Sequence, residues 1–341
     1  MTTRFEPKPS WLKVRAPGGD RYHALKGTLR DLDLHTVCEE ARCPNVGECW
    51  REGTATVMLL GDTCTRGCRF CAVTTGDPRG AVDPREPEHV ARAIGRLELS
   101  YVVLTMVDRD DLLDFGAEHV ARTVVRLHAL RPDLLVEALV GDFQGHAGYI
   151  DTVVDAEPDV FGHNVEVVRR LTPRVRDARC GYDRSLDVLR RAKERSAGRL
   201  TKSSLMVGIG EEPAEVSEAL RDLRSAGVDV VTIGQYLRPS PRHAPVARYV
   251  EPAEFAAWEV EARALGFLYA ASGPLVRSSY KAAEVWVRAK LGAAPADEAS
   301  AVLAERARQA AEGAERVRAE APEGDPPEAP ALVSAASLVR R

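Results

Sequence analysis

The amino-acid sequence predicts an α/β fold in which a parallel sheet is closed, or partly closed, into a barrel. From residue 55 onward, short apolar and β-branched runs alternate with segments long enough to form crossover helices. Continuous apolar runs of this kind are typical of parallel strands buried on both faces. Polar residues follow the runs directly, and active sites collect at the carboxyl ends of barrel strands. We therefore expect the functional residues at that end.

The bulk composition is that of an ordinary globular protein without bias toward nucleic acid or membranes. Hydrophobic residues make up 45% and charged residues 29% of the 341 positions, and the formal net charge is −4. This charge gives no positive field that would attract polyanions. No apolar run reaches the length of a membrane-spanning helix, and the polar start lacks the apolar core of a signal peptide. We expect a cytoplasmic protein with no nucleic-acid partner and no membrane contact.

The strands and helices are predicted in order along the chain. Strands are expected at 55–60, 101–105, 134–140, 159–164, 202–209 and 229–234, with a possible seventh at 267–272. Helices are expected at 87–99, 116–130, 146–156, 184–197 and 213–226, and another ends near residue 291. A short helix is also predicted at 36–41. Pro44 would prevent this helix from continuing.

Six of the seven cysteines form two groups of three, which indicates metal binding. The first group is Cys38, Cys43 and Cys49, and the second is Cys64, Cys68 and Cys71. In a reducing compartment, such close groups favour metal ligation over disulfides. Three cysteines are an incomplete set for a four-ligand site. Each group therefore either takes a ligand from elsewhere or keeps one metal position open.

Structural zinc is the main alternative to iron–sulfur ligation, and the spacing disfavours it. Zinc ribbons usually pair one C-x2-C unit with another or with histidines. Here the spacings are C-x4-C-x5-C and C-x3-C-x2-C, so neither group is half of such a pair. Closely spaced cysteines in glycine-bearing loops are how cubane clusters are held. We therefore predict two iron–sulfur sites.

The second cysteine group resembles the signature of the radical S-adenosylmethionine enzymes. In that superfamily the motif follows the first strand, and an aromatic residue, here Phe70, precedes the last cysteine. From about residue 11 to residue 291 the chain is also similar to the lipoyl synthase family. The motifs that carry this resemblance are Val37-Cys38-Glu39-Glu40, Gly61-Asp62-Thr63-Cys64-Thr65-Arg66, His163-Asn164-Val165-Glu166, Met206-Val207-Gly208-Ile209-Gly210-Glu211, Gln235-Tyr236-Leu237-Arg238-Pro239-Ser240 and Arg277-Ser278-Ser279-Tyr280.

The resemblance implies a fold and two cofactors. Lipoyl synthases have a partial (β/α)6 barrel of the TIM type, with a second cubane cluster at its mouth. By this likeness Cys64, Cys68 and Cys71 hold a [4Fe–4S] cluster whose open iron chelates S-adenosylmethionine. An electron from this cluster cleaves S-adenosylmethionine to a radical. That chemistry requires a site that excludes water.

An auxiliary [4Fe–4S] cluster is the second implied cofactor. The resemblance assigns four ligands to it, namely Cys38, Cys43, Cys49 and Ser279. Spacing alone leaves Ser278 open as the ligand, and a helix N-cap is the alternative role for either serine. Oxygen binds cluster iron more weakly than thiolate does. A serine ligand therefore suits a cluster that the family consumes as its sulfur source.

Other polar residues are assigned by the same likeness. Contacts to S-adenosylmethionine are suggested at four residues near strand ends: Asn164, Glu166, Lys202 and Glu211. Lys202 opens its predicted strand, which weakens its assignment. Glu211 could equally be a solvated acid in the first turn of the next helix.

Three residues near these motifs have an open role at this point. Arg66 and Arg69 lie inside the cysteine loop, where they could offset cluster charge or lie on the surface. Cys180 is expected to be an ordinary buried or half-buried thiol. Gly141 stands where the family more often has proline, which we interpret as a loop variation.

Four regions are expected along the chain. Residues 1–54 form an N-terminal arm with the auxiliary-cluster loop, and 55–272 form the radical S-adenosylmethionine barrel. Residues 273–292 close the auxiliary cluster, and 293–341 form a charged tail. The segment 298–320 could be a charged helix, but its apolar face is thin. The segment 322–330 is expected to be disordered, and the tail as a whole flexible.

The resemblance implies a sulfurtransferase that inserts two sulfurs, at C6 and C8, into an octanoyl chain on a carrier lysine. The implied carriers are lipoyl domains of 2-oxoacid dehydrogenases and the glycine-cleavage H protein, and a ferredoxin or flavodoxin would supply electrons. Two alternatives stay open. A biotin-synthase-like enzyme or a methylthiotransferase would keep the second cysteine group but not the first group with the motif at 277–280. A two-cluster electron carrier would need four cysteines per cluster.

Overall fold

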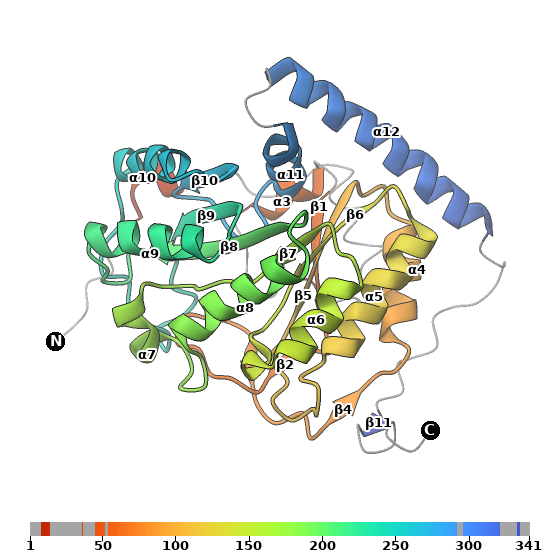
Figure 1. The fold of residues 1–341 in the computed structure, drawn as a ribbon, viewed down its shortest axis with the longest axis horizontal. Coiled ribbons are helices and arrows are strands. Elements are labelled where there is room, and N and C mark those ends of the chain that lie inside the picture. The colour runs from red at the N-terminus through yellow and green to blue at the C-terminus, as the bar shows by residue number, and fades with distance from the viewer. Residues whose placement is uncertain are drawn as a thin grey trace.

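The computed structural model describes residues 8–13, 36, 45–51, 54–291, 296–320 and 333–334. Apart from Thr36, the predicted helix at 36–41 lies outside these residues, as do Cys38 and Cys43. Figure 1 shows one sheet wrapped by helices on its outer side, with the long helix α12 across one end. Among the helices described, none combines the length and apolar character needed to cross a membrane.

A single parallel sheet of seven strands forms the barrel. Its spatial order follows the chain: β1 (Thr54–Leu59), β5 (Tyr101–Met106), β6 (Leu135–Leu139), β7 (Val160–Gly162), β8 (Leu200–Val207), β9 (Val230–Gln235) and β10 (Tyr269–Gly273). The sheet is open between its two edge strands, β1 and β10, which makes it a partial barrel. All six predicted strands and the possible seventh are confirmed, with ends that shift by at most two residues.

Alternating side chains of each strand serve two different packing layers. In β5, Val102 and Leu104 belong to the core between sheet and outer helices, whereas Tyr101 and Val103 face the barrel interior. Because both faces are covered, both sets are apolar. This is why the strands appear as continuous apolar runs in the sequence.

Six helices cover the outer face of the sheet. They are α4 (Glu86–Gly95), α5 (Ala117–Leu130), α6 (Ala147–Asp155), α8 (Tyr182–Arg195), α9 (Pro213–Ser225) and α10 (Pro252–Ala264). Helix α10 is an addition to the predicted elements. Its start carried a signal nonetheless: Pro252 occupies the first turn, and Glu251 and Glu254 form a capping box.

The remaining elements are short. They are η1 (Ser10–Leu12), α3 (Val46–Arg51), β2 (Thr63–Cys64), β3 (Thr74–Thr75), β4 (Ala81–Val82), η2 (Phe143–Gly145), η3 (Arg169–Leu171), α7 (Thr172–Val175) and β11 (Val333–Ser334). Strands β2 and β3 pair with each other close to the cysteine loop.

Two helices, α11 (Ala282–Leu291) and α12 (Ala296–Glu320), lie at the end of the barrel opposite β2 (Figure 1). The buried guanidinium of Arg131 donates to the carbonyl of Leu97 at 3.0 Å and to that of Ala310 in α12 at 3.2 Å. A Cβ on Gly313 would lie 2.4 Å from Arg131 Nε, so only glycine permits this approach. For 296–320 the structure therefore shows a docked helix instead of the flexible tail that was expected.

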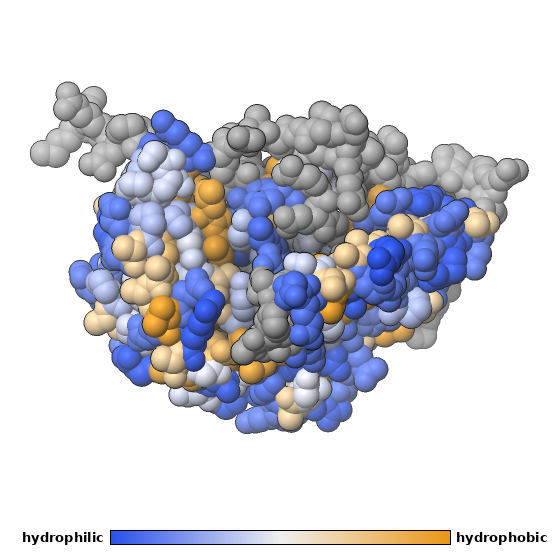
Figure 2. All heavy atoms as spheres, turned by 90° about the horizontal axis from the view of Figure 1, so that it is seen from above, coloured by the Kyte–Doolittle hydropathy of each residue, from blue (hydrophilic) through white to orange (hydrophobic). Residues whose placement is uncertain are grey.

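The thin apolar face of α12 is sufficient because its residues are small. Ala310 and Ala314 are buried, and Val317 is 9% exposed. Small side chains let the helix approach closely enough for Arg131 to bond its backbone. Figure 2, which views the molecule from the α12 side, shows hydrophilic residues over most of this face.

Candidate functional site

The second cysteine group lies in a loop at the carboxyl end of β1. Leu60 and Gly61 have φ angles of 68° and 86°, and this left-handed turn ends the strand. The loop is closed where Cys64 pairs with Thr75, and the N–H of Gly76 donates to the Cys64 carbonyl at 3.0 Å. Cys64, Cys68 and Cys71 are all partly buried in it. The structure thus brings the three predicted ligands into one closed loop.

The environment of the three sulfurs fits a cluster site. The backbone N–H of Arg66 donates to Cys64 Sγ at 3.4 Å, and that of Asp177 donates to Cys68 Sγ at 3.3 Å. Backbone bonds of this kind orient and tune cluster thiolates. No three His, Cys, Asp or Glu side chains of the described residues converge on a point suited to one ion. A cubane does not require this, because each thiolate binds a different iron.

Burial keeps these thiols protonated in the metal-free loop. It raises the pKa of Cys64 to about 11 and also raises the pKa of Cys71. The pKa of Cys68 is raised as well. The largest cause is a hydrogen bond with Cys180, and burial is the second. Bound iron supplies the positive charge that makes thiolates favourable in such a place. The donor set therefore fits an iron–sulfur cluster.

Arg66 anchors the loop to the barrel. Its side chain is buried and donates to both carboxylate oxygens of Asp110, at 2.9 and 2.8 Å. It forms further ion pairs with Asp142 at 2.8 Å and Asp108 at 3.5 Å. Burial raises the pKa of Asp108 to about 6, although Arg66 opposes the shift. Arg66 is thus neither a surface residue nor a free cation beside the cluster.

The departure at Gly141 has a steric reason. A Cβ at this position would lie 2.4 Å from Asp108 Oδ1. Any other residue, proline included, would displace that carboxylate from its place beside Arg66. The ion pair between Arg66 and Asp108 therefore depends on glycine at position 141.

The four residues suggested to contact S-adenosylmethionine separate into two pairs. Asn164 Nδ2 donates to Glu166 Oε1 at 3.1 Å, and Glu166 is half-buried and close enough to Cys71 to raise the pKa of that thiol. These two residues lie at the cysteine loop, after β7. Burial also raises the pKa of Glu166.

Lys202 and Glu211 lie in other surroundings. Lys202 Nζ bonds both oxygens of Glu137, at 2.8 and 3.1 Å, inside the amino-terminal half of the barrel. Its position does not support the predicted cofactor contact. Glu211 accepts from the backbone N–H groups of Gly208 and Ile209, at 2.6 and 3.0 Å. It is buried, which contradicts the solvated alternative, and it fixes the turn after β8.

Cys49, the described member of the first cysteine group, lies on α3 before β1. The segment 275–281 packs against this helix. Asn45 Nδ2 donates to the carbonyl of Leu275 at 2.6 Å, and Tyr280 Oη donates to Glu48 Oε2 at 3.1 Å. Burial, with Glu48 and Cys49 nearby, raises the pKa of Tyr280 to about 12. Cys49 is thus brought to the motif that contains Ser279.

The path of segment 275–281 explains two sequence features. A Cβ on Gly234 of β9 would lie 2.0 Å from the carbonyl oxygen of Val276, so the segment crosses β9 at a glycine. Helix α11 begins at Ala282, three residues after Ser279. Ser279 is therefore not at the N-cap position. Cys49 lies on α3, which precedes β1 and lies near α11 in Figure 1.

Sequence reasoning missed the side chains that join these parts. Glu48 connects α3 to Tyr280 and, at 3.3 Å, to Lys281. His243 Nε2 lies 2.9 Å from the carbonyl of Cys71, and its Nδ1 lies 2.9 Å from Ser240 Oγ. The adjacency of Glu48 to Cys49 was the one available signal. The contact of His243 depends on the fold alone.

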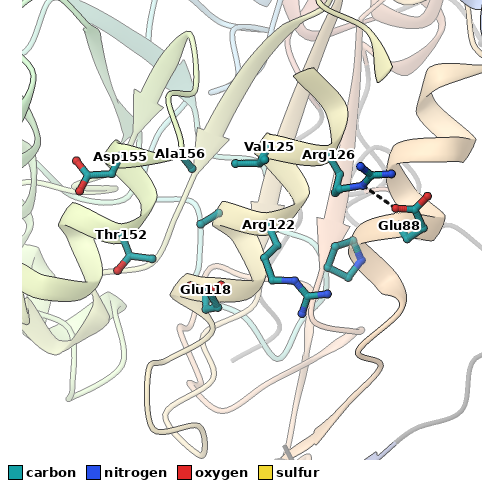
Figure 3. A pocket seen from close by; sticks show the side chains of 10 residues that line it. Glu88, Glu118, Arg122, Val125, Arg126, Thr152, Asp155 and Ala156 are labelled. Carbon is teal, nitrogen blue, oxygen red and sulfur yellow. Dashed lines mark hydrogen bonds and ion pairs between the residues drawn. The ribbon is translucent and has the colours of Figure 1, made fainter. Parts of the chain in front are cut away.

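A groove of about 420 Å³ lies away from Cys49 and from the second cysteine group, on the outer face between α4, α5 and α6 (Figure 3). Across it, Arg126 Nε donates to Glu88 Oε2 at 2.7 Å. Val125 on its wall is 53% exposed. It is a crevice between surface helices, outside the site.

Comparisons with known proteins agree with this geometry. The radical SAM superfamily model matches residues 58–223, and the model of the N-terminal domain of lipoyl synthase matches residues 3–43. The chain is 69% identical over 370 residues to the lipoyl synthase of Sorangium cellulosum, covering 99% of this chain and 100% of that protein.

More distant relatives carry the same name. The chain is 57% identical over 282 residues to the lipoyl synthase of Thermus thermophilus, covering 83% of this chain and 87% of that one. It is 54% identical over 293 residues to the mitochondrial lipoyl synthase of Candida albicans, covering 84% of this chain and 76% of that one. The chain belongs to the lipoyl synthase family, the sulfurtransferases of the radical S-adenosylmethionine superfamily.

Proposed function

We propose that the protein inserts two sulfur atoms, at C6 and C8, into an octanoyl chain amide-linked to a lysine of a carrier protein. The observation that supports this best is the contact between α3 and segment 275–281. It puts Cys49 beside the motif that carries Ser279. An auxiliary cluster with Cys49 and Ser279 among its ligands would require this junction.

The residues assigned to the first cluster are Cys64, Cys68 and Cys71. Those assigned to the auxiliary cluster are Cys38, Cys43, Cys49 and Ser279. When bound, the first cluster and S-adenosylmethionine supply hydrogen abstraction from unactivated carbon, and the auxiliary cluster supplies sulfur. The division of the chain into regions at residues 54, 272 and 292 stays a prediction.

The protein's own side chains hold and enclose this chemistry. Arg66 fixes the loop through three aspartates, so the cluster ligands keep one position relative to the strand ends. Phe70 packs against the hydrophobic core behind β8 and β9, which removes water from that side of the loop. Asn164 and Glu166 offer polar atoms next to Cys71 for the amino and carboxylate groups of S-adenosylmethionine.

The proposed partners are octanoylated lipoyl domains of 2-oxoacid dehydrogenases and the glycine-cleavage H protein. Electrons would come from a ferredoxin or flavodoxin. We place the reaction in the cytoplasm, because two groups of reduced cysteines require a reducing compartment.

The test is an anaerobic incubation of the reconstituted protein with S-adenosylmethionine, a reductant and an octanoyl-lysine peptide. Mass spectrometry should find the peptide with two added sulfurs, and iron analysis should find about eight irons per chain, as two cubanes require. If 5′-deoxyadenosine forms without any dithiolated peptide, sulfur insertion is refuted and only the radical step remains.

A further inference from the structure

Four arginines around the cysteine loop differ from most other arginines of the barrel. They are Arg69, Arg174, Arg238 and Arg242, and we call them the arginine surface. Within the described part of the chain, no carboxylate lies in ion-pair distance of any of them. Neighbouring surface arginines are paired: Arg170 bonds Glu215 at 2.7 Å and Arg179 bonds Asp177 at 2.9 Å. Unpaired cations grouped in one place create a local positive field that paired ones do not.

Backbone contacts gather these arginines over the loop. The N–H of Arg69 donates to the carbonyl of Val175 at 2.8 Å, and Arg69 NH1 donates to that of Arg174 at 3.2 Å. On the other side, the N–H of Ala244 donates to the carbonyl of Arg69 at 2.7 Å. Arg238 holds the same loop by donating to the His243 carbonyl at 2.9 Å. Arg69 and Arg238 both lie close enough to Tyr236 to lower its pKa, against the raising effect of burial.

The arginine surface lies on the outside of the cysteine loop, where backbone bonds join three loops. Arg69 is itself between Cys68 and Cys71, and it is exposed. The loops after β1, β7 and β9 are joined here by backbone bonds, and His243 binds the carbonyl of Cys71. An acyl chain would need an opening at this place. Electron transfer needs no opening, because an electron only has to cross the short distance from this surface to the cluster ligands.

We propose that the arginine surface is the docking site for an acidic one-electron carrier protein of the flavodoxin or ferredoxin type. This rests on the proposed function, because a radical S-adenosylmethionine enzyme needs one electron for each cleavage. The docked carrier loses one electron, and the cluster held by the loop gains it. No bond is made or broken in this step. Charge complementarity between the arginine surface and an acidic carrier mainly sets the association rate and its salt dependence.

The test uses the double variant Arg174→Glu/Arg242→Glu in the reconstituted holoprotein. Both side chains are exposed and make no bond that holds the loop. Binding of oxidised flavodoxin, measured by titration calorimetry at low salt, should weaken about tenfold, in the range expected for steering charges. The difference from the parent protein should shrink as ionic strength rises, because exposed charges are screened. The matched control is the double variant Arg92→Glu/Arg308→Glu, which makes the same change in net charge on side chains of α4 and α12 that are 62% and 70% exposed, away from the cysteine loop.

Rates of S-adenosylmethionine cleavage with two reductants complete the test. With dithionite the double variant should match the parent, and with reduced flavodoxin it should be about tenfold slower, as steering predicts. Unchanged flavodoxin affinity and rate would overturn the proposal. So would an increase in the KM for the octanoylated carrier with dithionite, because the surface would then bind that protein. If the parent protein with dithionite cleaves no S-adenosylmethionine, the proposed function fails instead.

Discussion

The two cysteine groups flank the same strand, β1, yet the protein holds them in different ways. The loop after β1 is fixed by a buried arginine, Arg66, and by backbone bonds to the loops after β7 and β9. The helix before β1 is held through Asn45 and Glu48, which contact the segment after β10. A cluster that must persist is thus built into the barrel. The cluster proposed to give up sulfur would include Cys49, which lies at a junction of two parts of the chain that are distant in the sequence.

The largest expected effect that tests this comparison is on the two catalytic steps. Cys64→Ala should abolish formation of 5′-deoxyadenosine, because the first cluster loses a thiolate. Cys43→Ala should leave that cleavage intact and stop sulfur insertion. Chromatography of 5′-deoxyadenosine and mass spectrometry of the peptide measure the two steps. Cys180→Ala is the matched control, since this thiol contacts Cys68 but is no assigned ligand. Equal loss of both steps in both cluster variants would contradict the division of roles.

The next largest effect concerns the stability of the barrel where Arg66 anchors the cysteine loop. Arg66→Met leaves Asp108, Asp110 and Asp142 without their shared cation, and breaking a buried ion pair costs about 3–5 kcal/mol. Chemical denaturation of the protein should show this loss. Arg92→Met, on the exposed side of α4, should change the free energy of unfolding little. A small effect at Arg66 would mean that the barrel does not depend on the anchor.

The stability of the barrel at the end that holds the cysteine loop should also depend on pH in the acid range. Burial lowers the pKa of His163 to about 4, and its ring is held by the carbonyl of Val140 and by Ser185 Oγ. Between about pH 4 and the ordinary histidine pKa of about 6.5, the unfolded chain binds the extra proton and the folded one does not. The contribution of His163 to the free energy of unfolding should therefore fall by about 3 kcal/mol as the pH falls through this window, while the raised pKa of Asp108 acts in the opposite direction, so the comparison with a His163 variant isolates it.

Denaturation at several pH values measures this slope, and His163→Gln should reduce it. If that variant does not fold, titration of the His163 ring by NMR in the intact protein gives the same answer. A ring that titrates near pH 6.5 would refute the prediction.

The smallest effect concerns the junction of α3 with segment 275–281. Glu48→Gln weakens the bond from Tyr280 and the ion pair with Lys281, which together are worth about 1 kcal/mol. We expect a lower iron content at the auxiliary site and slower sulfur insertion, with cleavage of S-adenosylmethionine unchanged. Glu88→Gln removes ion pairs on the outer face and is the control. Slower cleavage in Glu48→Gln would mean that the two ends of β1 are coupled.

Several features could be predicted from the sequence because they are local. The strands follow from runs that are apolar on both faces, and the cysteine spacing indicates two sites that each need a further ligand. The capping box at Glu251 is a local signal for the start of α10, but the helix is only weakly amphipathic, so its periodicity does not indicate a helix. Lys202 shows where local reasoning stops: its position in the sheet, beside Glu137, follows from register between strands that are far apart in the sequence.

The sequence by itself determined the chemistry of this protein, because thiol spacing and strand periodicity are written in neighbouring residues. Only the tertiary structure decided how the parts meet. Gly234 is needed because Val276 crosses it, and Arg66 is buried because three aspartates from two other loops converge on it. The apolar face of α12 is sufficient because Gly313 lets Arg131 reach its backbone. Each of these depends on a distance between residues that only the folded chain brings together.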